Sequence, residues 1–306
     1  MGIFSFKNKK PKIIIVCGPT ASGKTGLSID LAKHYDGEII SADSRQVYIG
    51  LDIGSAKVTQ KEMHGIPHHM IDVTTTDHKY SAAEYIRMAK IHIGEIVARG
   101  KTPIICGGTG QYIDALVFNK TYPNVPANPE LRKELEKKTI TELFEQLAKK
   151  DPRRALTVDR NNKVRLVRAL EIIDTLGIVP VQKTNSPYSP LFIGLDLPKE
   201  QLNKGIKKRA LDRFENQGML QEAIDLHTKG LSYERMESLG LEYRYMARHL
   251  EDKINYDEMV RELTTKTIQY AKRQRTWFKR NKKIHWFNGI NDTQEIKKLV
   301  SKFLKK

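Results

Sequence analysis

The chain has 306 residues, enough for one large α/β domain with an insertion or for two ordinary domains. Lysine and arginine total 53 against 36 aspartate and glutamate, so the formal net charge is +17, which favours polyanionic partners such as nucleic acid. No apolar run of about eighteen residues could cross a membrane, and the N-terminus lacks the pattern of a secretory signal. We therefore expect a cytoplasmic protein without membrane contact.

Strand-like and helix-like segments alternate along much of the chain. Short apolar runs rich in β-branched residues predict strands, and apolar residues at helical spacing predict helices. This alternation implies a mainly parallel sheet with helices on both faces. The predicted strands span residues 12–17, 37–43, 102–110, 191–197 and 283–287, and the clearest early helices span 24–35 and 81–99.

The character of the sequence changes between residues 121 and 190, where it becomes polar and proline-punctuated and keeps helical periodicity without a convincing buried strand. We interpret 121–190 as a helical insertion domain. Residues 1–120 and 191–306 then form the core that carries the sheet, and the last fifteen residues resemble an amphipathic closing helix.

The two cysteines, Cys17 and Cys106, each end an apolar, strand-like run just before a glycine. We interpret both as small core residues rather than metal ligands, nucleophiles or a disulfide.

The first predicted strand is followed by "GPTASGKT", which fits the phosphate-loop pattern G-x-x-x-x-G-K-[ST]. The glycines allow a tight path that turns backbone N–H groups inward, Lys24 supplies a positive charge, and the Thr25 hydroxyl is a Mg²⁺ ligand. The next helix adds its positive N-terminus. This predicts a core like that of phosphate-loop NTPases. The predicted phosphate-binding residues are Gly18, Pro19, Thr20, Ala21, Ser22, Gly23, Lys24 and Thr25.

A phosphate loop does not by itself identify a reaction, because NTPases, small-molecule kinases and some transferases all use one. The second predicted strand ends in Asp43, which could hold a metal as the second acidic residue of an NTPase does. An Asn-Lys-x-Asp motif is absent from the sequence, which argues against a signalling GTPase.

Six further blocks follow in a fixed order, and with the phosphate loop they resemble the tRNA dimethylallyltransferases, also called tRNA isopentenyltransferases. The resemblance covers nearly the whole chain, from about residue 12 to about residue 287. It implies transfer of a dimethylallyl group from dimethylallyl diphosphate to the exocyclic amine of the adenosine 3′-adjacent to the tRNA anticodon. The blocks are "DSRQVY" from Asp43, "LDIGSAK" (51–57), "IPHHMID" (66–72), "GGTGQY" (107–112), "RLVRALEI" (165–172) and "YAKRQRTWF" (270–278).

The resemblance implies that the phosphate loop holds a leaving group. Lys24 and a Mg²⁺ near Thr25 would neutralise the departing diphosphate. Asp43 would act as general base, because an adenine amine must lose a proton as it bonds to carbon. A metal ligand and a helix cap are the alternatives for Asp43.

The resemblance also implies tRNA contacts close to Asp43. Ser44, Arg45 and Gln46 would contact the flipped adenosine or its neighbours. Thr109 would contact tRNA or the leaving group, although a turn residue in a glycine loop is a fair alternative for it.

The family places an arginine on the diphosphate, and two residues compete for that role. Arg209 lies three residues after Ile206, as the family spacing requires, and Arg213 lies one turn further along the same helix. One extra residue before Gly218 shifts the alignment here. We select Arg209 as the catalytic arginine.

The segment 256–280 predicts a helix with two different faces. A stripe that includes Thr267, Tyr270 and Trp277 is interpreted as core, and Lys272 and Arg273 lie on a basic face that would meet tRNA phosphates.

By resemblance, Arg165 and Arg168 in the insertion form a second cluster facing the anticodon stem-loop. A solvated basic helix face is the alternative for this pair.

Several features stay open. His64, His68 and His69 are interpreted as loop or hydrogen-bonding residues rather than a zinc site, and the role of Arg244 is unassigned. A phosphate-loop kinase and an RNA-binding module with a vestigial phosphate loop are the alternative functions. The resemblance implies a monomer.

Overall fold

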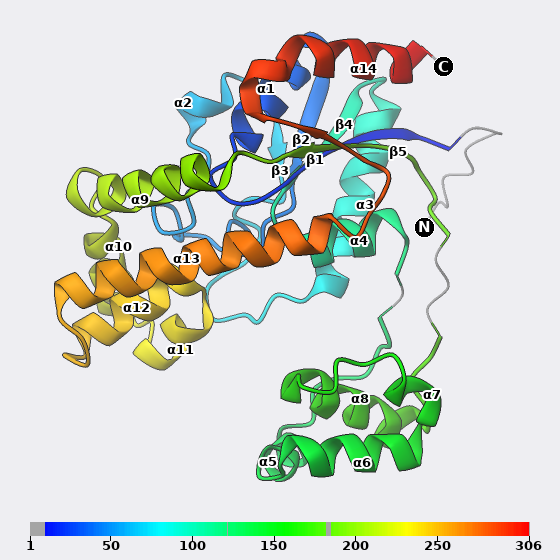
Figure 1. The fold of residues 1–306 in the computed structure, drawn as a ribbon, viewed down its shortest axis with the longest axis vertical. Coiled ribbons are helices and arrows are strands. Elements are labelled where there is room, and N and C mark those ends of the chain that lie inside the picture. The colour runs from blue at the N-terminus through cyan, green and yellow to red at the C-terminus, as the bar shows by residue number, and fades with distance from the viewer. Residues whose placement is uncertain (1–9, 121, 182–184, 306) are drawn as a thin grey trace. The chain divides into compact units, whose positions relative to one another are not determined.

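The computed structural model describes residues 10–120, 122–181 and 185–305. The chain divides into two compact units: residues 1–119 with 185–306, here called the core unit, and residues 120–184, here called the insertion unit. Figure 1 shows the path from the blue N-terminal strand to the red C-terminal helix. The expected boundary at residue 190 lies inside a strand, because the chain already joins the sheet at Ser189.

The core unit is built on a six-stranded, fully parallel sheet with the order β3-β2-β4-β1-β5-β6. This confirms the parallel α/β fold class predicted from the alternation of elements. The strands are β1 (Lys12–Cys17), β2 (Gly37–Ser41), β3 (His68–His69), β4 (Thr102–Gly107), β5 (Ser189–Leu195) and β6 (Ile284–Phe287).

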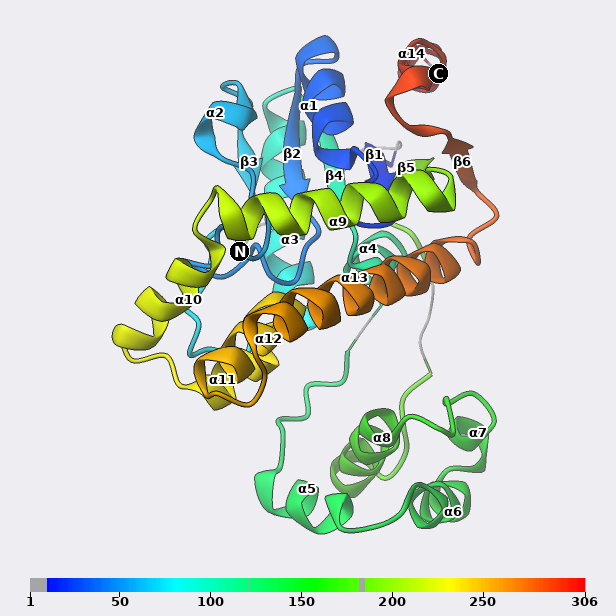
Figure 2. The ribbon, with the colours of Figure 1, turned by 60° about the vertical axis from the view of Figure 1, so that its left-hand side comes forward.

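The central strand β1 pairs with β4 on one side and β5 on the other. Its residues from Ile13 to Cys17 are completely buried, as expected for a strand covered on both faces. Ile14 and Val16 of this strand pack with α1 (Lys24–His34) and α14 (Thr293–Lys305) on one face of the sheet. The residues that alternate with them face the other side, where α3 (Ala82–Ala98) and α4 (Gly110–Val117) pack (Figure 2).

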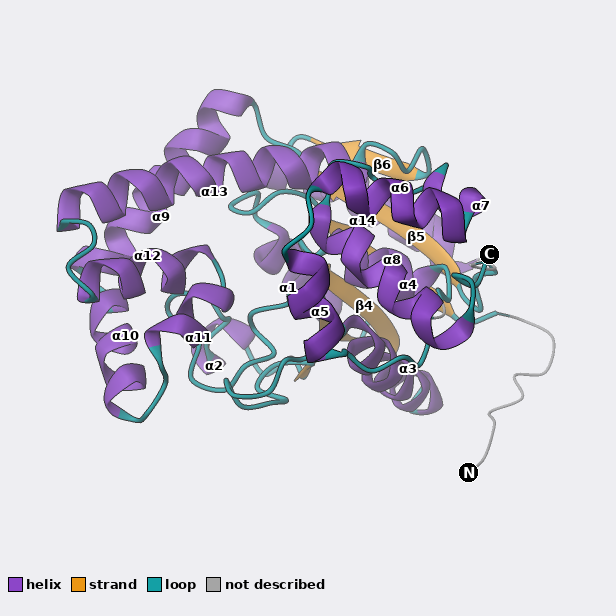
Figure 3. Cartoon of the chain, turned by 90° about the horizontal axis from the view of Figure 1, so that it is seen from below, coloured by secondary structure: helices purple, strands orange, loops and turns teal. Residues whose placement is uncertain are grey.

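A group of helices follows β5 and packs around the loop after β2. Among them, α9 and α13 lie side by side (Figures 2 and 3). Helix α13 begins at a capping box, in which Asn255 accepts from the Glu258 N–H and the Glu258 side chain accepts from the Asn255 N–H. The group comprises α9 (Lys199–Glu215), α10 (Met219–Thr228), α11 (Tyr233–Ser238), α12 (Leu241–Leu250) and α13 (Tyr256–Phe278), and the short α2 (Gln60–Met63) and η1 (Gly289–Asp292) complete the unit.

The regular elements of the insertion unit are all helices in its described residues, and the unit has its own core of leucine, valine and isoleucine side chains from α5, α6 and α8. Glu171 is almost fully buried there and accepts hydrogen bonds from Arg132 and Arg168. The helices are α5 (Pro129–Glu136), α6 (Ile140–Lys150), α7 (Pro152–Ala155) and α8 (Lys163–Leu176). None of the described helices in either unit is long and apolar enough to span a membrane.

The edge strand β3 is not predicted from the sequence, because two polar residues give no alternating pattern. His69 Nε2 lies 2.7 Å from the carboxylate of the buried Glu38, and His68 Nδ1 lies 2.8 Å from the Ile66 carbonyl oxygen. Both histidines are therefore hydrogen-bonding residues. The described residues contain no group of three or more His, Cys, Asp or Glu side chains arranged to hold a metal.

Candidate functional site

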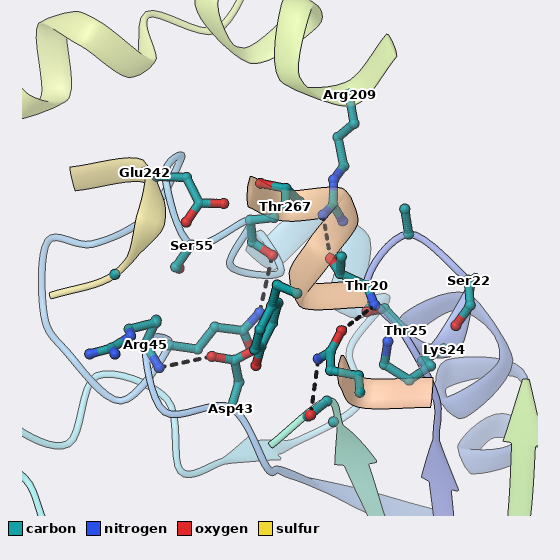
Figure 4. A pocket seen from close by; sticks show the side chains of 18 of the residues that line it. Thr20, Ser22, Lys24, Thr25, Asp43, Arg45, Ser55, Arg209, Glu242 and Thr267 are labelled. Atoms are coloured by element: carbon teal, nitrogen blue, oxygen red, sulfur yellow. Dashed lines mark hydrogen bonds between the residues drawn. The ribbon is translucent and has the colours of Figure 1, made fainter. Parts of the chain in front are cut away.

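A cavity of about 490 Å³ lies at the carboxyl ends of β1, β2 and β4, where parallel sheets commonly bind ligands. The phosphate loop forms one wall, the segment after β2 forms another, and side chains from α9, α12 and α13 close the rest (Figure 4). The lining residues include Thr20–Gly26, Asp43–Gln46, Ser55, Ala56, Cys106–Gly108, Arg209, Arg213, Gly240–Glu242, Arg244, Thr267, Tyr270 and Gln274.

The phosphate loop has the tight backbone path that the motif predicts. Gly18 has φ +142° and lies so close to β5 that an added Cβ would be 2.3 Å from the Leu195 carbonyl oxygen. Gly23 also lies in the left-handed region, with φ 88°, and starts α1 without any side-chain cap. The first-turn amides of α1 are thus left for an anionic ligand.

Positive and unpaired polar groups gather around this loop. Burial lowers the pKa of Lys24 to about 8, and nearby Arg209 acts in the same direction. Lys24 Nζ donates to the Pro19 carbonyl at 2.6 Å. Ser22 Oγ and Arg209 Nε are buried and have no hydrogen-bond partner among the described residues. An anion bound here would satisfy these groups and favour protonated Lys24.

We expect the affinity for inorganic pyrophosphate to fall as pH rises through about 8, because Lys24 then loses its proton. The loss should be about tenfold between pH 7 and pH 9, measured by calorimetry. Pyrophosphate only gains negative charge over this range, so weakening must come from the protein. Lys24→Arg should flatten the dependence, and Lys33→Arg at an exposed position on α1 should not. A pH-independent affinity in the wild type would contradict the assignment.

Asp43 sits just after β2, at the cavity wall facing the phosphate loop (Figure 4). Its Oδ1 accepts from the Arg45 N–H at 2.8 Å. Thr109 Oγ1 accepts from the Ser44 N–H at 3.1 Å, so Thr109 ties the end of β4 to the Asp43 segment. The structure thus gives Thr109 a role in shaping this turn.

Arg45 and Gln46 line the same wall but are held differently. Among the described residues, Arg45 Nη1 makes a single long contact of 3.4 Å, to the Ser238 carbonyl oxygen. Gln46 is fixed at both ends of its amide, because Oε1 accepts from Ser41 Oγ at 3.0 Å and Nε2 donates to the Ala56 carbonyl at 3.1 Å.

The two competing arginines on α9 occupy different environments. Arg209 Nη2 donates to Thr20 Oγ1 at 2.5 Å, so this guanidinium touches the phosphate loop (Figure 4). Burial lowers the pKa of Arg209 to about 10, with the neighbouring Arg213 contributing. Arg213 is only 3 % exposed and donates to the carbonyls of Ile53 and Gly54 at 3.1 and 2.7 Å.

The loop that Arg213 binds is also held by Glu222, a residue that the sequence analysis misses. The Glu222 carboxylate accepts from the backbone N–H groups of Asp52, Ile53 and Gly54 at 2.7 to 3.0 Å. It also accepts from the Tyr243 hydroxyl at 2.7 Å. This loop leads directly into Ser55 and Ala56 at the cavity wall.

Gln274 is the second missed residue and connects α13 to the phosphate loop. Its Oε1 accepts from the Thr20 N–H at 2.8 Å, and its Nε2 donates to the Gly108 carbonyl at 2.9 Å. Its signal in the sequence is a polar residue at helical spacing within an otherwise apolar stripe. The interpretation of that stripe as core is incomplete, because Thr267, Tyr270 and Gln274 line the cavity.

We expect Gln274→Leu to lower the free energy of unfolding by about 2 to 4 kcal/mol, because the Thr20 N–H and the Gly108 carbonyl both lose their partner. The loss should appear as a lower denaturant midpoint with an unchanged slope. Gln269→Leu, on the exposed face of the same helix, is the matched control and should change stability by less than about 0.5 kcal/mol. Equal midpoints for the two variants would refute this role.

The remaining predicted residues lie as follows. Lys272 and Arg273 are exposed on α13, with the Arg273 guanidinium 5.7 Å from the Tyr270 ring centre. Within the insertion unit, Arg165 is about half exposed, whereas Arg168 donates to the Val125 carbonyl and to the carboxylate of Glu171.

The two cysteines differ in burial, and Arg244 lies at the cavity. Cys17 is fully buried and confirms the core interpretation. Cys106 is only partly buried: it packs against the core and also lines the cavity, so that interpretation is incomplete for it. Arg244, also at the cavity, donates to the Glu237 carbonyl at 3.1 Å.

Comparisons with known proteins agree with this geometry. The IPP transferase family model matches residues 46–281. A tRNA dimethylallyltransferase of Bacillus pumilus is 39 % identical over 292 residues, covering 92 % of this chain and 91 % of that one. A tRNA dimethylallyltransferase of Anoxybacillus flavithermus is 38 % identical and covers 92 % of each chain.

Solved structures give the same result. A tRNA isopentenylpyrophosphate transferase from Bacillus halodurans superposes with a TM-score of 0.74 at 34 % identity, covering 97 % of both chains. A eukaryotic dimethylallyltransferase described as acting on tRNA has a TM-score of 0.77 at 28 % identity, over 91 % of this chain and 74 % of that one. The chain therefore belongs to the IPP transferase family of tRNA dimethylallyltransferases.

Proposed function

We infer that this chain transfers a dimethylallyl group from dimethylallyl diphosphate to the exocyclic amine of the adenosine 3′-adjacent to the tRNA anticodon, releasing diphosphate. The observation that carries this inference is the cavity itself, which brings a cradle for a diphosphate and the Asp43 carboxylate into one space. The names of the relatives support the same reaction.

The diphosphate would lie on the phosphate loop, against the α1 amides, Lys24 and Arg209. When the allylic C–O bond breaks, its electron pair leaves with the diphosphate and the negative charge there increases. Lys24 and Arg209 are already held beside the loop by Pro19 and Thr20, so they stabilise this charge with little rearrangement. The phosphoryl groups remain intact throughout.

The other half of the reaction takes place at Asp43. As the adenine nitrogen forms its bond to the allylic carbon, it becomes positively charged and must lose a proton. The carboxylate of Asp43 is aimed by the Arg45 amide on one oxygen, and the other oxygen accepts this proton. Ser44, Arg45 and Gln46 would contact the flipped base or its neighbours, and Thr109 holds their segment in place.

A magnesium ion fits the oxygen donors of this cavity. Mg²⁺ is commonly held by one or two protein oxygens together with substrate phosphates, and Thr25 offers a hydroxyl on the first turn of α1. We assign Thr25 as its protein ligand. The ion would neutralise charge on the bound diphosphate. The Asp43 carboxylate lines the same cavity and is the candidate for a second ligand, which is the alternative to its role as base.

For tRNA we propose that the anticodon stem-loop contacts the exposed row on α13 that includes Lys272 and Arg273. Phosphate contacts of this type position an RNA without reading its sequence. Arg165 is free enough in the insertion unit to add a contact, since the one ion pair that it makes with the described residues, to Asp159, is long at 3.8 Å. Arg168 would act mainly by holding Glu171 and Val125.

The test is incubation of the protein with labelled dimethylallyl diphosphate, Mg²⁺ and unmodified tRNA, followed by nucleoside analysis. Label should appear in adenosine, and a tRNA with guanosine at the target position should stay unlabelled. Absence of label in adenosine would defeat the proposal, and ATP turnover without tRNA would indicate a kinase instead.

We propose further that the enzyme works in the cytoplasm, and that it acts as a monomer, because residues of one chain are sufficient to form the cavity. Sedimentation should then give a mass near 35.1 kDa, and twice that mass at working concentrations would contradict the proposal.

A further inference from the structure

A second, much smaller cavity lies behind the catalytic one, between α1, β2 and β3. Its volume is about 20 Å³, which is room for one water molecule and too little for a substrate group. Polar side chains from Thr25, Ser28, Ser41, Gln46 and His68 line it, together with Ile39, Val58, Ile71 and Cys106. Small cavities with polar walls normally hold water, whereas apolar ones stay dry.

Two of these polar side chains present an unsatisfied atom. Ser28 is fully buried, and its Oγ has no hydrogen-bond partner among the described residues apart from a weak contact with the Cys106 thiol. His68 Nε2 is also buried without a partner in the described chain. Leaving such a group buried without a partner is unfavourable, because it has lost its hydrogen bonds to water. Two of them on one small cavity indicate a shared partner.

The hydrogen bond at Nδ1 of His68 determines which nitrogen of the ring carries the proton and which one can accept. Its Nδ1 lies 2.8 Å from the Ile66 carbonyl oxygen, which can only accept, so Nδ1 carries the proton. Burial lowers the pKa of His68 and favours the neutral ring. Nε2 is then an acceptor, while Ser28 Oγ can donate. A water molecule is able to accept from one and donate to the other.

Ser41, a third polar residue in the wall of the small cavity, is connected to the catalytic cavity by hydrogen bonds. Ser41 Oγ donates to Gln46 Oε1 at 3.0 Å, which leaves its own lone pairs to accept, and Gln46 Nε2 donates to the Ala56 carbonyl at 3.1 Å. Gln46 and Ala56 both line the large cavity beside Asp43. The direction of every hydrogen bond in this series is therefore determined.

We propose that the small cavity binds one structural water molecule, which accepts from Ser28 Oγ and donates to His68 Nε2 and Ser41 Oγ. Through Ser41 the water fixes the orientation of the Gln46 amide, so Ser28, Ser41 and His68 are positioning residues for the tRNA side of the catalytic cavity. The catalytic consequence rests on the proposed function, whereas the water site itself does not.

The site is tested first by a crystal structure of the full chain at a resolution that shows ordered water. We expect one water within about 3.2 Å of Ser28 Oγ, Ser41 Oγ and His68 Nε2. A dry cavity, or a water touching only one of the three atoms, would overturn the proposal. This measurement is independent of whether the protein prenylates tRNA.

The positioning role is tested by Ser41→Ala, His68→Leu and the double variant. Each single variant should raise the KM for tRNA by about 3- to 10-fold and leave the KM for dimethylallyl diphosphate unchanged. Because both act through one series of hydrogen bonds, the double variant should be no worse than the more damaging single one. Additive effects, or a loss of kcat with both KM values unchanged, would show that these residues only support folding.

The matched control is Ile71→Val, which removes one methyl group from the same cavity without touching a hydrogen bond. It should keep the wild-type KM for tRNA, and a KM raised as in His68→Leu would assign the effect to packing.

Discussion

Replacement of Asp43 by asparagine is expected to lower the rate of prenyl transfer by about 10²- to 10⁴-fold, the usual effect of removing a general base. Asparagine is nearly the same size, and its Oδ1 can still accept from the Arg45 N–H, so the loop after β2 should keep its shape. It cannot take up a proton. Single-turnover measurements with saturating tRNA should show the loss, and binding assays should show nearly unchanged tRNA affinity.

Asp36 provides the control because it lies at the opposite end of β2. Its side chain is 80 % exposed and, within the part of the chain that the structure describes, makes only a 3.3 Å contact with Lys101, so Asp36→Asn should leave the rate unchanged. Near-normal turnover by Asp43→Asn would remove this carboxylate from the mechanism. Equal losses of tRNA binding and of rate would instead assign Asp43 to RNA recognition.

The second large effect concerns the arginines of α9, which should separate catalysis from stability. Arg209→Ala removes the guanidinium that contacts Thr20 on the phosphate loop. We expect a loss of about 10²- to 10³-fold in the rate of transfer, comparable to removing one preorganised donor. The free energy of unfolding should change little, because Arg209 already has an unpaired buried Nε.

Arg213→Ala should behave in the opposite way. Its side chain satisfies the carbonyls of Ile53 and Gly54 and lies 3.7 Å from Glu242, so its removal leaves buried polar groups unpaired. We expect a loss of about 2 to 4 kcal/mol in stability, measured by denaturant unfolding, and a modest rate effect in the remaining folded protein. A rate loss confined to Arg213→Ala would reverse the two assignments.

The parts of the site that the sequence predicts are those encoded by neighbouring residues. The phosphate loop follows from glycines at fixed spacing between a β-branched run and a helical pattern, and the structure has left-handed Gly23 at the start of α1. Asp43 could be placed because a parallel strand must end at the edge of the sheet where the loop lies. The fold class followed from the same local alternation.

Contacts between distant segments were beyond such reasoning. Gln274 meets Thr20 across 254 positions, and Glu222 meets Gly54 across 168. A single sequence gives only the polarity of such residues, and a buried glutamine looks like an exposed one until the packing of α13 is known. The same holds for Arg209 and Arg213, whose roles differ because of what each faces rather than because of their spacing.

Boundaries were predicted less well than elements. The strand expected at 191–197 spans Ser189–Leu195, because pairing with β1 rather than hydrophobicity determines where it begins. The two-residue strand β3 exists only through its pairing with β2, so no local pattern could have indicated it.

The position of β1 in the middle of the sheet has a consequence for how the protein is made. The ribosome delivers residues 12–17 first, yet their partners arrive with residues 102–107 and then 189–195, after the insertion unit has emerged. The tether from Gln274 follows later still, and Ile296 and Val300 join the apolar layer beside α1 after that. A nascent chain therefore carries the phosphate loop without a finished site until Gln274 has emerged. The catalytic cavity, whose wall includes Gln274, forms only after residue 274 has been made.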